Sequence, residues 1–458
     1  MQQHLALAYP GAPVALLGYA GQQLPVTVAT LDGGFFTGQA PYPAAPAWRE
    51  WRGRRVPFFF DEHPTAPLLT LAGAQVTVAA DVISAAFYLL SGWQEYFSAE
   101  RDQHGRFPYA ASVQRQYGFV TLPVVNYYFD VLKTALEHAT GQRYPPRRWG
   151  PQQAEFAAFI SHDIDNLRSA WKAPAKAALQ QGQLLRFAQL LGRHLTRPDA
   201  WDNLEAVAAQ VAQYGGRSTF LVLPEHKPAP NGTPNADYRL TPRLRRRLER
   251  LQEQGCELGL HGSYGTATNF SLLFRELDSS PGSAVKGLRF HYLSWEPRQT
   301  PTTVAAATDG LAASPAYDST LGFAEHFGFR HSYCLPFYPF AFGQGEAADF
   351  LELPLNVMDA TLYHPRYLQL ASEQILPALV PMLTEIQRFG GVASVLWHNE
   401  NFDPANECNG PRQFHELMQH LQAAGAVFLT GRQVYEEFRP PLRGTPAEVR
   451  GGKNAEVR

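Results

Sequence analysis

The stretch FISHDID, residues 159–165, joins an apolar run to two carboxylates, and the interpretation of the whole chain begins there. Side chains alternate along a strand, so Asp163 and Asp165 emerge on the same side if the strand continues that far. Two like charges this close are costly unless a cation lies beside them or one carboxylate takes up a proton. The stretch therefore predicts a divalent metal ion bound by one carboxylate, with the other free to move protons.

Three later apolar runs end in polar side chains, and each carries a histidine near its C-terminal end. They are LGLHGSY (258–264), LRFHY (288–292) and VLWHN (395–399). The histidines are His261, His291 and His398, and the second run also contains Arg289. In a β/α barrel the C-terminal ends of the strands meet at one mouth, where active sites are normally built. We therefore expect these side chains to converge with the aspartate pair.

The order and content of these motifs resemble those of the polysaccharide deacetylases, carbohydrate esterase family 4. Asp163 and Asp165 are similar to the family's first motif, and His261 to the leading histidine of its second. Residues 289–292 resemble the third motif, Arg-x-Pro-aromatic, with histidine in place of proline, and residues 396–398 match the last, Leu-x-His. The resemblance covers roughly residues 153 to 435. It implies an irregular β/α barrel, and it points to a bacterial branch that has an additional N-terminal domain.

The chain departs from the family at the second histidine of the metal motif, where residue 265 is glycine. Two repairs stay open: His291 replaces the missing ligand, or fewer protein groups and more water hold the metal. Catalytic zinc commonly keeps three protein ligands and an open position, a count that Asp165, His261 and His291 would satisfy. A histidine beside an arginine also suits a substrate contact. We expect a divalent metal ion as cofactor, with zinc the first candidate.

The resemblance implies a metal-dependent hydrolase that removes an N- or O-linked acetyl group from a carbohydrate. In this interpretation Asp163 is the general base and His398 the general acid, a role that suits a group with a pKa near neutrality. By resemblance, Arg289 orients the catalytic aspartate. Each assignment has a structural alternative, since aspartates at a strand end commonly cap the next helix and histidines are often buried core groups.

Four further residues are candidates for contacts with the substrate: Tyr292, Trp295, Trp397 and Asp318. Tyr292, or a backbone N–H near it, would stabilise the oxyanion. The two tryptophans would offer flat apolar faces to a sugar ring, although aromatic residues in a barrel more often belong to the core. Asp318 follows another apolar stretch and would approach the same mouth, with a turn or cap role as the favoured alternative.

Stretches rich in proline and glycine divide the chain into two domains, a linker and a tail. Residues 1–138 predict a smaller α+β domain, with helices near 81–97 and 124–137. A Pro- and Gly-containing linker at 139–153 leads into the barrel, residues 154–438, where strand-like and helical runs alternate. The polar tail at 439–458 predicts disorder.

Two basic segments are interpreted as surface helices without a binding role. Residues 171–197 predict a helical insertion between the first two barrel strands, which we interpret as a surface helix pair rather than a cover for the mouth. The helix expected after Thr241 carries Arg243 and three successive arginines from Arg245, which favour a solvated face over an anion site. Leu244, Leu248 and Leu251 repeat at helical spacing and predict its buried stripe.

Composition limits the class of protein. The 458 residues, 45% hydrophobic, suit two globular domains, and a formal charge of −2 argues against broad nucleic-acid binding. The three cysteines do not form a disulfide framework and predict buried free thiols. No leader or membrane span is evident, so we expect a cytoplasmic protein that acts on a carbohydrate, of unspecified oligomeric state. Two other classes stay open: an inactive glycan-binding protein, which Gly265 favours, and an assembly module of a polysaccharide pathway acting through residues 1–138.

Overall fold

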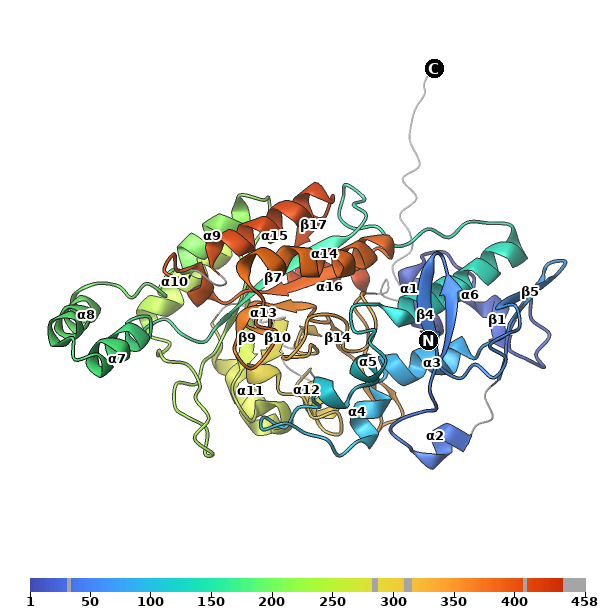
Figure 1. Ribbon diagram of the computed structural model, residues 1–458, viewed down its shortest axis with the longest axis horizontal. Helices are drawn as coiled ribbons and strands as arrows, with labels where there is room; N and C mark the ends of the chain where they lie inside the picture. The colour runs from blue at the N-terminus through green and yellow to red at the C-terminus, as the bar shows by residue number, and fades with distance from the viewer. Residues whose placement is uncertain (31–33, 282–286, 309–314, 407–409, 440–458) are drawn as a thin grey trace, which may run out of the picture.

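A computed structural model describes residues 1–30, 34–281, 287–308, 315–406 and 410–439 (Figure 1). Its main feature is a nine-stranded parallel sheet with the order β14-β11-β10-β9-β8-β7-β16-β15, in which β17 also pairs with β7. The strands are β7 (Ala157–Ile164), β8 (Thr219–Val222), β9 (Glu257–Gly262), β10 (Gly287–Phe290), β11 (Tyr317–Asp318), β14 (Leu351–Glu352), β15 (Val357–Met358), β16 (Val392–Leu396) and β17 (Val427–Leu429). Among the described residues β14 and β15 do not pair with each other. The sheet is therefore an irregular, open β/α barrel, and the predicted fold class is confirmed.

Helices pack around this sheet because its strands are buried on both sides; every residue of β7 is buried. They are α9 (Leu204–Ala212), α10 (Pro242–Glu253), α11 (Phe270–Ser279), α12 (Thr300–Thr308), α13 (Asp359–Tyr363), α14 (Ser372–Arg388), α15 (Pro411–Ala423) and α16 (Gly431–Phe438). In α10 the Thr241 hydroxyl caps the N–H of Leu244, and Leu244, Leu248 and Leu251 are buried. The predicted helix and its stripe are confirmed.

The register of the central strands brings the predicted side chains to one edge. In the pairing of β9 with β10, His261 lies opposite Arg289. In the pairing of β7 with β8, Asp163 lies opposite Leu221, near the C-terminal end of both strands. Parallel pairing aligns the strand ends, so motifs far apart in sequence reach a common mouth.

The N-terminal region is an α+β unit, as predicted (Figure 1). A four-stranded sheet has the order β1 (Leu17–Tyr19), β2 (Val26–Val28), β6 (Gln75–Val78) and β5 (Leu69–Ala72). β3 (Ala47–Trp51) and β4 (Arg54–Phe58) form a hairpin. The helices are α1 (Gln2–Ala8), α2 (Gly34–Gly38), α3 (Val82–Leu90), α4 (Trp93–Phe97), α5 (Val113–Gln116) and α6 (Val124–Thr140). The expected helices near 81–97 and 124–137 are present.

One hydrophobic core runs from the N-terminal region into the barrel. Hydrogen bonds also cross between the two, including Tyr127 Oη to Glu385 at 2.7 Å and Trp149 Nε1 to the Gly390 carbonyl at 2.8 Å. Residues 142–148, inside the predicted linker, form no helix or strand. The N-terminal region is therefore packed firmly on the barrel rather than tethered to it.

The basic insertion is a helical hairpin, α7 (Lys172–Gln180) and α8 (Leu184–Thr196), which projects at the end of the molecule opposite the N-terminal region (Figure 1). The predicted surface helix pair is confirmed. Cys256 and Cys334 are buried free thiols, while residue 408 and the tail from 440 lie outside the described residues. No described helix is long and apolar enough to cross a membrane.

Candidate metal centre

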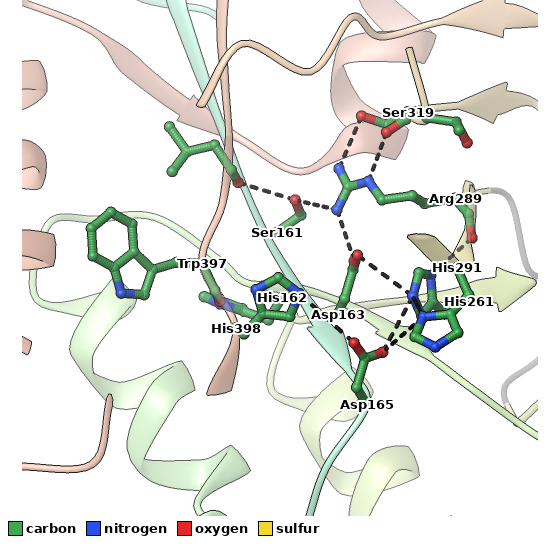
Figure 2. Close-up of polar contacts among 12 residues, drawn as sticks. Ser161, His162, Asp163, Asp165, His261, Arg289, His291, Ser319, Trp397 and His398 are labelled. Carbon is green, nitrogen blue, oxygen red and sulfur yellow. Dashed lines mark hydrogen bonds and ion pairs between the residues drawn. The ribbon is translucent and has the colours of Figure 1, made fainter. Parts of the chain in front are cut away.

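Three side chains from three successive parts of the barrel converge on one point (Figure 2). Asp165 directly follows β7, His261 lies in β9, and His291 directly follows β10. His261 Nε2 is 3.3 Å from Asp165 Oδ1 and 3.0 Å from His291 Nδ1, and His291 Nδ1 is 3.5 Å from Asp165 Oδ1. These are the three residues that the sequence analysis offered as a metal triad.

The spacing of the three atoms fits a tetrahedral ion. Ligand atoms about 2.0–2.1 Å from a tetrahedral zinc ion lie about 3.3–3.4 Å apart, and the three observed separations span that value. Asp165 Oδ1 is buried and accepts no hydrogen bond from the described residues, which is an unusual state for a buried carboxylate oxygen. A cation at this point would give that oxygen a partner, so the residues present fit a divalent metal.

Burial would lower the pKa of His261, but Asp163 and Asp165 raise it; the neutral ring has the tautomer that suits a ligand. Its Nδ1 lies 2.9 Å from the backbone carbonyl of Arg289, which can only accept a hydrogen bond. Nδ1 must therefore carry the proton in the neutral ring, and Nε2 presents its lone pair to the centre. A backbone carbonyl behind a metal-binding histidine fixes its tautomer and the orientation of its ring.

Neighbouring charges and burial shift the pKa values of the other two residues of the triad, Asp165 and His291. Burial would raise the pKa of Asp165, but His291 and His261 hold it well below its ordinary value. Burial lowers the pKa of His291 to about 4, against the opposing effect of Asp165. At neutral pH the centre therefore contains an ionised carboxylate and an uncharged His291, both in the form that binds a metal.

Asp163 sits beside the triad and is held by Arg289 (Figure 2). The fully buried guanidinium contacts Asp163 Oδ1 at 2.8 Å and donates to Ser161 Oγ and to the backbone carbonyl and hydroxyl of Ser319. The second oxygen, Oδ2, faces His261 Nε2 at 3.6 Å. Burial would raise the pKa of Asp163, but Arg289 and His261 hold it below its ordinary value, so the carboxylate is charged at neutral pH.

His398 lies on the other side of Asp165 from the two histidines, with its Nε2 3.9 Å from Asp165 Oδ2 (Figure 2). Its Nδ1 is 2.7 Å from Oδ1 of Asp359, a buried carboxylate that also accepts from the backbone N–H of His398 and from Asn401. Burial would lower the pKa of His398, but Asp359 holds it well above its ordinary value. His398 is thus a protonated imidazolium oriented toward the centre.

Asp359 was not among the residues singled out from the sequence. It stands directly after β15, as Asp165 stands after β7, so the same rule of a carboxylate after an apolar strand would have found it. The signal is weak because β15 has only two residues, Val357–Met358.

The backbone that carries His291 is strained. Tyr292 and Leu293, the next two residues, have φ of 60° and 54°. These values lie in the left-handed region of backbone conformations, which residues other than glycine seldom adopt. Such residues persist only where surrounding contacts hold them. Here Arg106, from the N-terminal region, donates to the Tyr292 carbonyl at 2.8 Å, and the His104 ring stacks on the Tyr292 ring at 4.7 Å.

The loop that makes these contacts is itself fixed. Asp102 forms an ion pair with Arg106 at 2.6 Å, and Arg101 pairs with Glu296, beyond the strained turn, at 3.0 Å. Residues 101–106 therefore clamp the segment that presents His291. The N-terminal region thus forms one wall of the site, and no feature of the sequence had indicated which of its residues do so.

Gly265 occupies a turn that suits glycine. Its φ is 97° and its ψ is −10°, so any other residue there would adopt a left-handed backbone. The family's second histidine would be strained at this position. The turn is thus one that suits glycine and disfavours histidine, and His291 offers the third atom of the candidate triad.

Three of the predicted substrate contacts lie elsewhere. Trp397 is fully buried and packs on Phe414 of α15, because neighbours on a strand point to opposite faces and His398 takes the face of the site. Trp295 is 3% exposed and belongs to the core. Asp318 is fully buried and bonds Thr320 in a local turn, and burial raises its pKa to about 7. These three residues are not offered to a substrate.

Tyr292 is the one predicted substrate contact beside the centre. It is partly exposed, and its ring lies 4.1 Å from that of His291. Its hydroxyl reaches the Pro234 carbonyl at 3.4 Å. A role in substrate binding stays a prediction for this residue.

Residues 13–141 match a family described as a family of unknown function (DUF7033), and no curated protein matches the chain. Three solved structures are similar at 11–16% identity, each covering 64% of this chain. They are a putative polysaccharide deacetylase from Mycobacterium smegmatis (TM-score 0.41, 94% of that chain), PuuE allantoinase (0.40, 93%) and a probable polysaccharide deacetylase from Pseudomonas aeruginosa PAO1 (0.40, 94%).

Proposed function

We propose that this chain is a metal-dependent hydrolase that removes an N- or O-linked acetyl group from a carbohydrate. The observation that carries the proposal is the convergence of Asp165, His261 and His291 at ligand spacing, between a charged carboxylate and a charged imidazolium. The choice of an acetylated carbohydrate as the substrate rests on the sequence motifs that resemble those of the polysaccharide deacetylases.

Asp165, His261 and His291 would hold the ion, with zinc as the first candidate. When bound, such an ion polarises an acyl carbonyl and lowers the pKa of a water molecule toward neutrality. Asp163 acts as general base: Arg289 fixes one of its oxygens and leaves Oδ2 to accept the proton of the attacking water.

His398 acts as general acid. Asp359 orients its ring and keeps it protonated, so Nε2 can give a proton to the departing amine or alkoxide. Asp163 and His398 both lie beside Asp165 (Figure 2), which suits proton removal from the attacking water and proton donation to the leaving group of one bound acyl group.

Two observations favour catalysis over a binding protein that has lost its activity. The third ligand position missing at Gly265 is supplied by His291, so the donor set is complete. A glycan-binding protein also has no need of a largely buried imidazolium–carboxylate pair such as His398 and Asp359, because removing two charges from water costs free energy.

The test is release of acetate by zinc-loaded protein from N-acetylated chitopentaose and from O-acetylated xylopentaose. Asp163→Asn and His398→Gln should each lower the rate by about 100-fold or more, since positioned acids and bases contribute roughly 10²–10⁴. His138→Gln, at an exposed histidine of α6 remote from the site, is the matched control and should be neutral. Release that is unchanged in Asp163→Asn would contradict the proposal.

A further inference from the structure

A groove of about 760 Å³ is lined in part by the segment that follows Asp165. Its walls are the hairpin α7–α8, the start of α10, and the segments around residues 167–168 and 236–241. It begins at Leu167, two residues beyond Asp165. A cavity of this size matches sites that enclose small organic ligands, so it has room for sugar units that extend from the centre.

The groove and the centre share a loop. The backbone N–H of Asp237, which lines the groove, bonds the Asp165 carbonyl at 3.1 Å. Two residues earlier, Asn235 accepts from the N–H of Tyr264, and the Pro234 carbonyl contacts the Tyr292 hydroxyl. Residues 234–237 therefore contact the metal centre on one side and contribute to the lining of the groove on the other.

Basic side chains dominate the lining, and five of them form no ion pair or side-chain hydrogen bond among the described residues. They are Arg168, Lys172, Arg197, Arg239 and Arg243. They come from separate segments around the groove instead of meeting at one point. Five unpaired cations around one hollow are notable in a chain whose formal net charge is −2.

The acidic residues of the lining, Asp199, Asp202 and Asp237, are fewer than its arginine and lysine side chains, so the groove keeps a positive balance. Asp237 accepts from the backbone N–H groups of Leu167 and Arg168 at 2.7 and 2.9 Å. Asp199 accepts from two other backbone N–H groups, and Asp202 pairs with Arg247 at 2.6 Å. The positive end of α10, which begins at Pro242, adds to the potential.

We propose that this groove binds an acidic glycan, one that carries carboxylates along its chain, and that it thereby presents a sugar of that glycan to the metal centre. Spread cations suit a ligand with repeated charges better than a single phosphate, and arginine pairs well with carboxylates. The second half of the inference rests on the proposed function, because only a deacetylase needs the sugar placed there.

The test is calorimetric binding of hexagalacturonate to the full-length, metal-free protein, with the fully methyl-esterified hexamer as its uncharged counterpart. Lys172→Glu/Arg243→Glu reverses one charge on each wall of the groove. Lys176→Glu/Arg246→Glu makes the same charge change on the same two helices at exposed positions outside it.

We expect hexagalacturonate to bind and its methyl ester not to bind. The groove variant should lose at least about tenfold in affinity, the control less than about twofold, and added salt should weaken binding. Equal binding of the ester, or equal losses in the two variants, would overturn the proposal. Binding to vesicles containing phosphatidylglycerol but not to hexagalacturonate would also overturn it, and would assign the hairpin, with its exposed Leu184, Leu185 and Leu195, to a membrane surface.

The two proposals fail separately. Acetate release from neutral glycans without any binding of hexagalacturonate would leave the hydrolase standing and remove the acidic-glycan groove. Groove-dependent binding of hexagalacturonate by a protein that releases no acetate from any glycan would keep the groove and remove the hydrolase.

Discussion

Asp165 and His261 extend from strands of the parallel sheet, whereas His291 lies on a turn that leaves it. For the first two, position follows from the parallel register of β7, β8 and β9, which pair as neighbours in the sheet. The turn of His291 is held by side chains of the N-terminal region, and Arg106 and Tyr292 are separated by 186 positions in the sequence. One half of the centre is therefore built by local strand geometry and the other by a tertiary contact.

This difference gives the N-terminal region a role in the centre. The barrel alone supplies a carboxylate and one histidine with fixed geometry. Residues 101–106 hold the strained backbone at Tyr292 and Leu293 and so position the third ligand. We expect perturbation of the strand half to abolish the centre and perturbation of the clamp to weaken it.

Within the turn half of the centre, the largest expected effect is that of His291→Ala on zinc affinity. Losing a residue that merely supports a ligand costs roughly 10- to 100-fold, so loss of the ligand itself should exceed about 100-fold. Calorimetric zinc titration of the metal-free variant measures this. Unchanged affinity would mean that two protein ligands and water suffice, and that His291 is a substrate contact.

Asp359→Asn should act on the acid and leave the metal in place. Asp359 raises the pKa of His398, so its removal should move the ring titration to lower pH. Because the acid works only when protonated, the loss of activity that accompanies rising pH should begin at a lower pH in the variant. The rate should also fall by about 100-fold. NMR titration of histidine rings in zinc-loaded protein measures the shift. A His398 midpoint that stays in place would exclude the assigned role of Asp359.

Arg106→Ala should lower zinc affinity by about tenfold, because it releases the Tyr292 carbonyl without removing a ligand. Arg115→Ala, at an exposed arginine of α5 in the same region, is the matched control. In the His291→Ala background Arg106→Ala should have no further effect on zinc affinity. An additive loss there would show that Arg106 acts by another route.

The smallest expected effect concerns the family's missing ligand. Gly265→Ala should destabilise the fold by about 1–2 kcal/mol, the usual cost of a left-handed backbone at a residue with a Cβ. Urea denaturation measures it. Gly265→His should show the same cost and should not restore zinc binding to His291→Ala; restoration would mean that the turn can adapt to the family's arrangement.

The sequence predicts the strand half of the centre well because its signals are local. Apolar runs that end in polar residues identify Asp163, Asp165, His261 and His398, and parallel pairing brings strand ends together in any β/α barrel. The basic hairpin and α10 were also predicted as elements. Their arginines were interpreted as solvated, because the sequence does not reveal that α7, α8 and α10 enclose a common groove.

Other features of the site were not predicted from the sequence. They depend on the face of the sheet to which a side chain points and on contacts between residues far apart in the chain. Trp397 was assigned to the mouth, but it alternates with His398 and so faces the core. Asp359 follows a strand too short to recognise, and Arg106 reaches the centre only through the packing of the N-terminal region. Of these, Asp359 contacts His398 and Arg106 contacts the turn that carries His291.

The most direct test of the account is zinc titration by calorimetry on metal-free protein, wild type against Asp165→Ala. The geometry predicts one tight site in the wild type, with about one zinc per chain, and no such site in the variant, because Asp165 supplies the only carboxylate of the triad. A wild type that binds no zinc, or a variant that binds it as tightly, would contradict the metal centre and the hydrolase built on it.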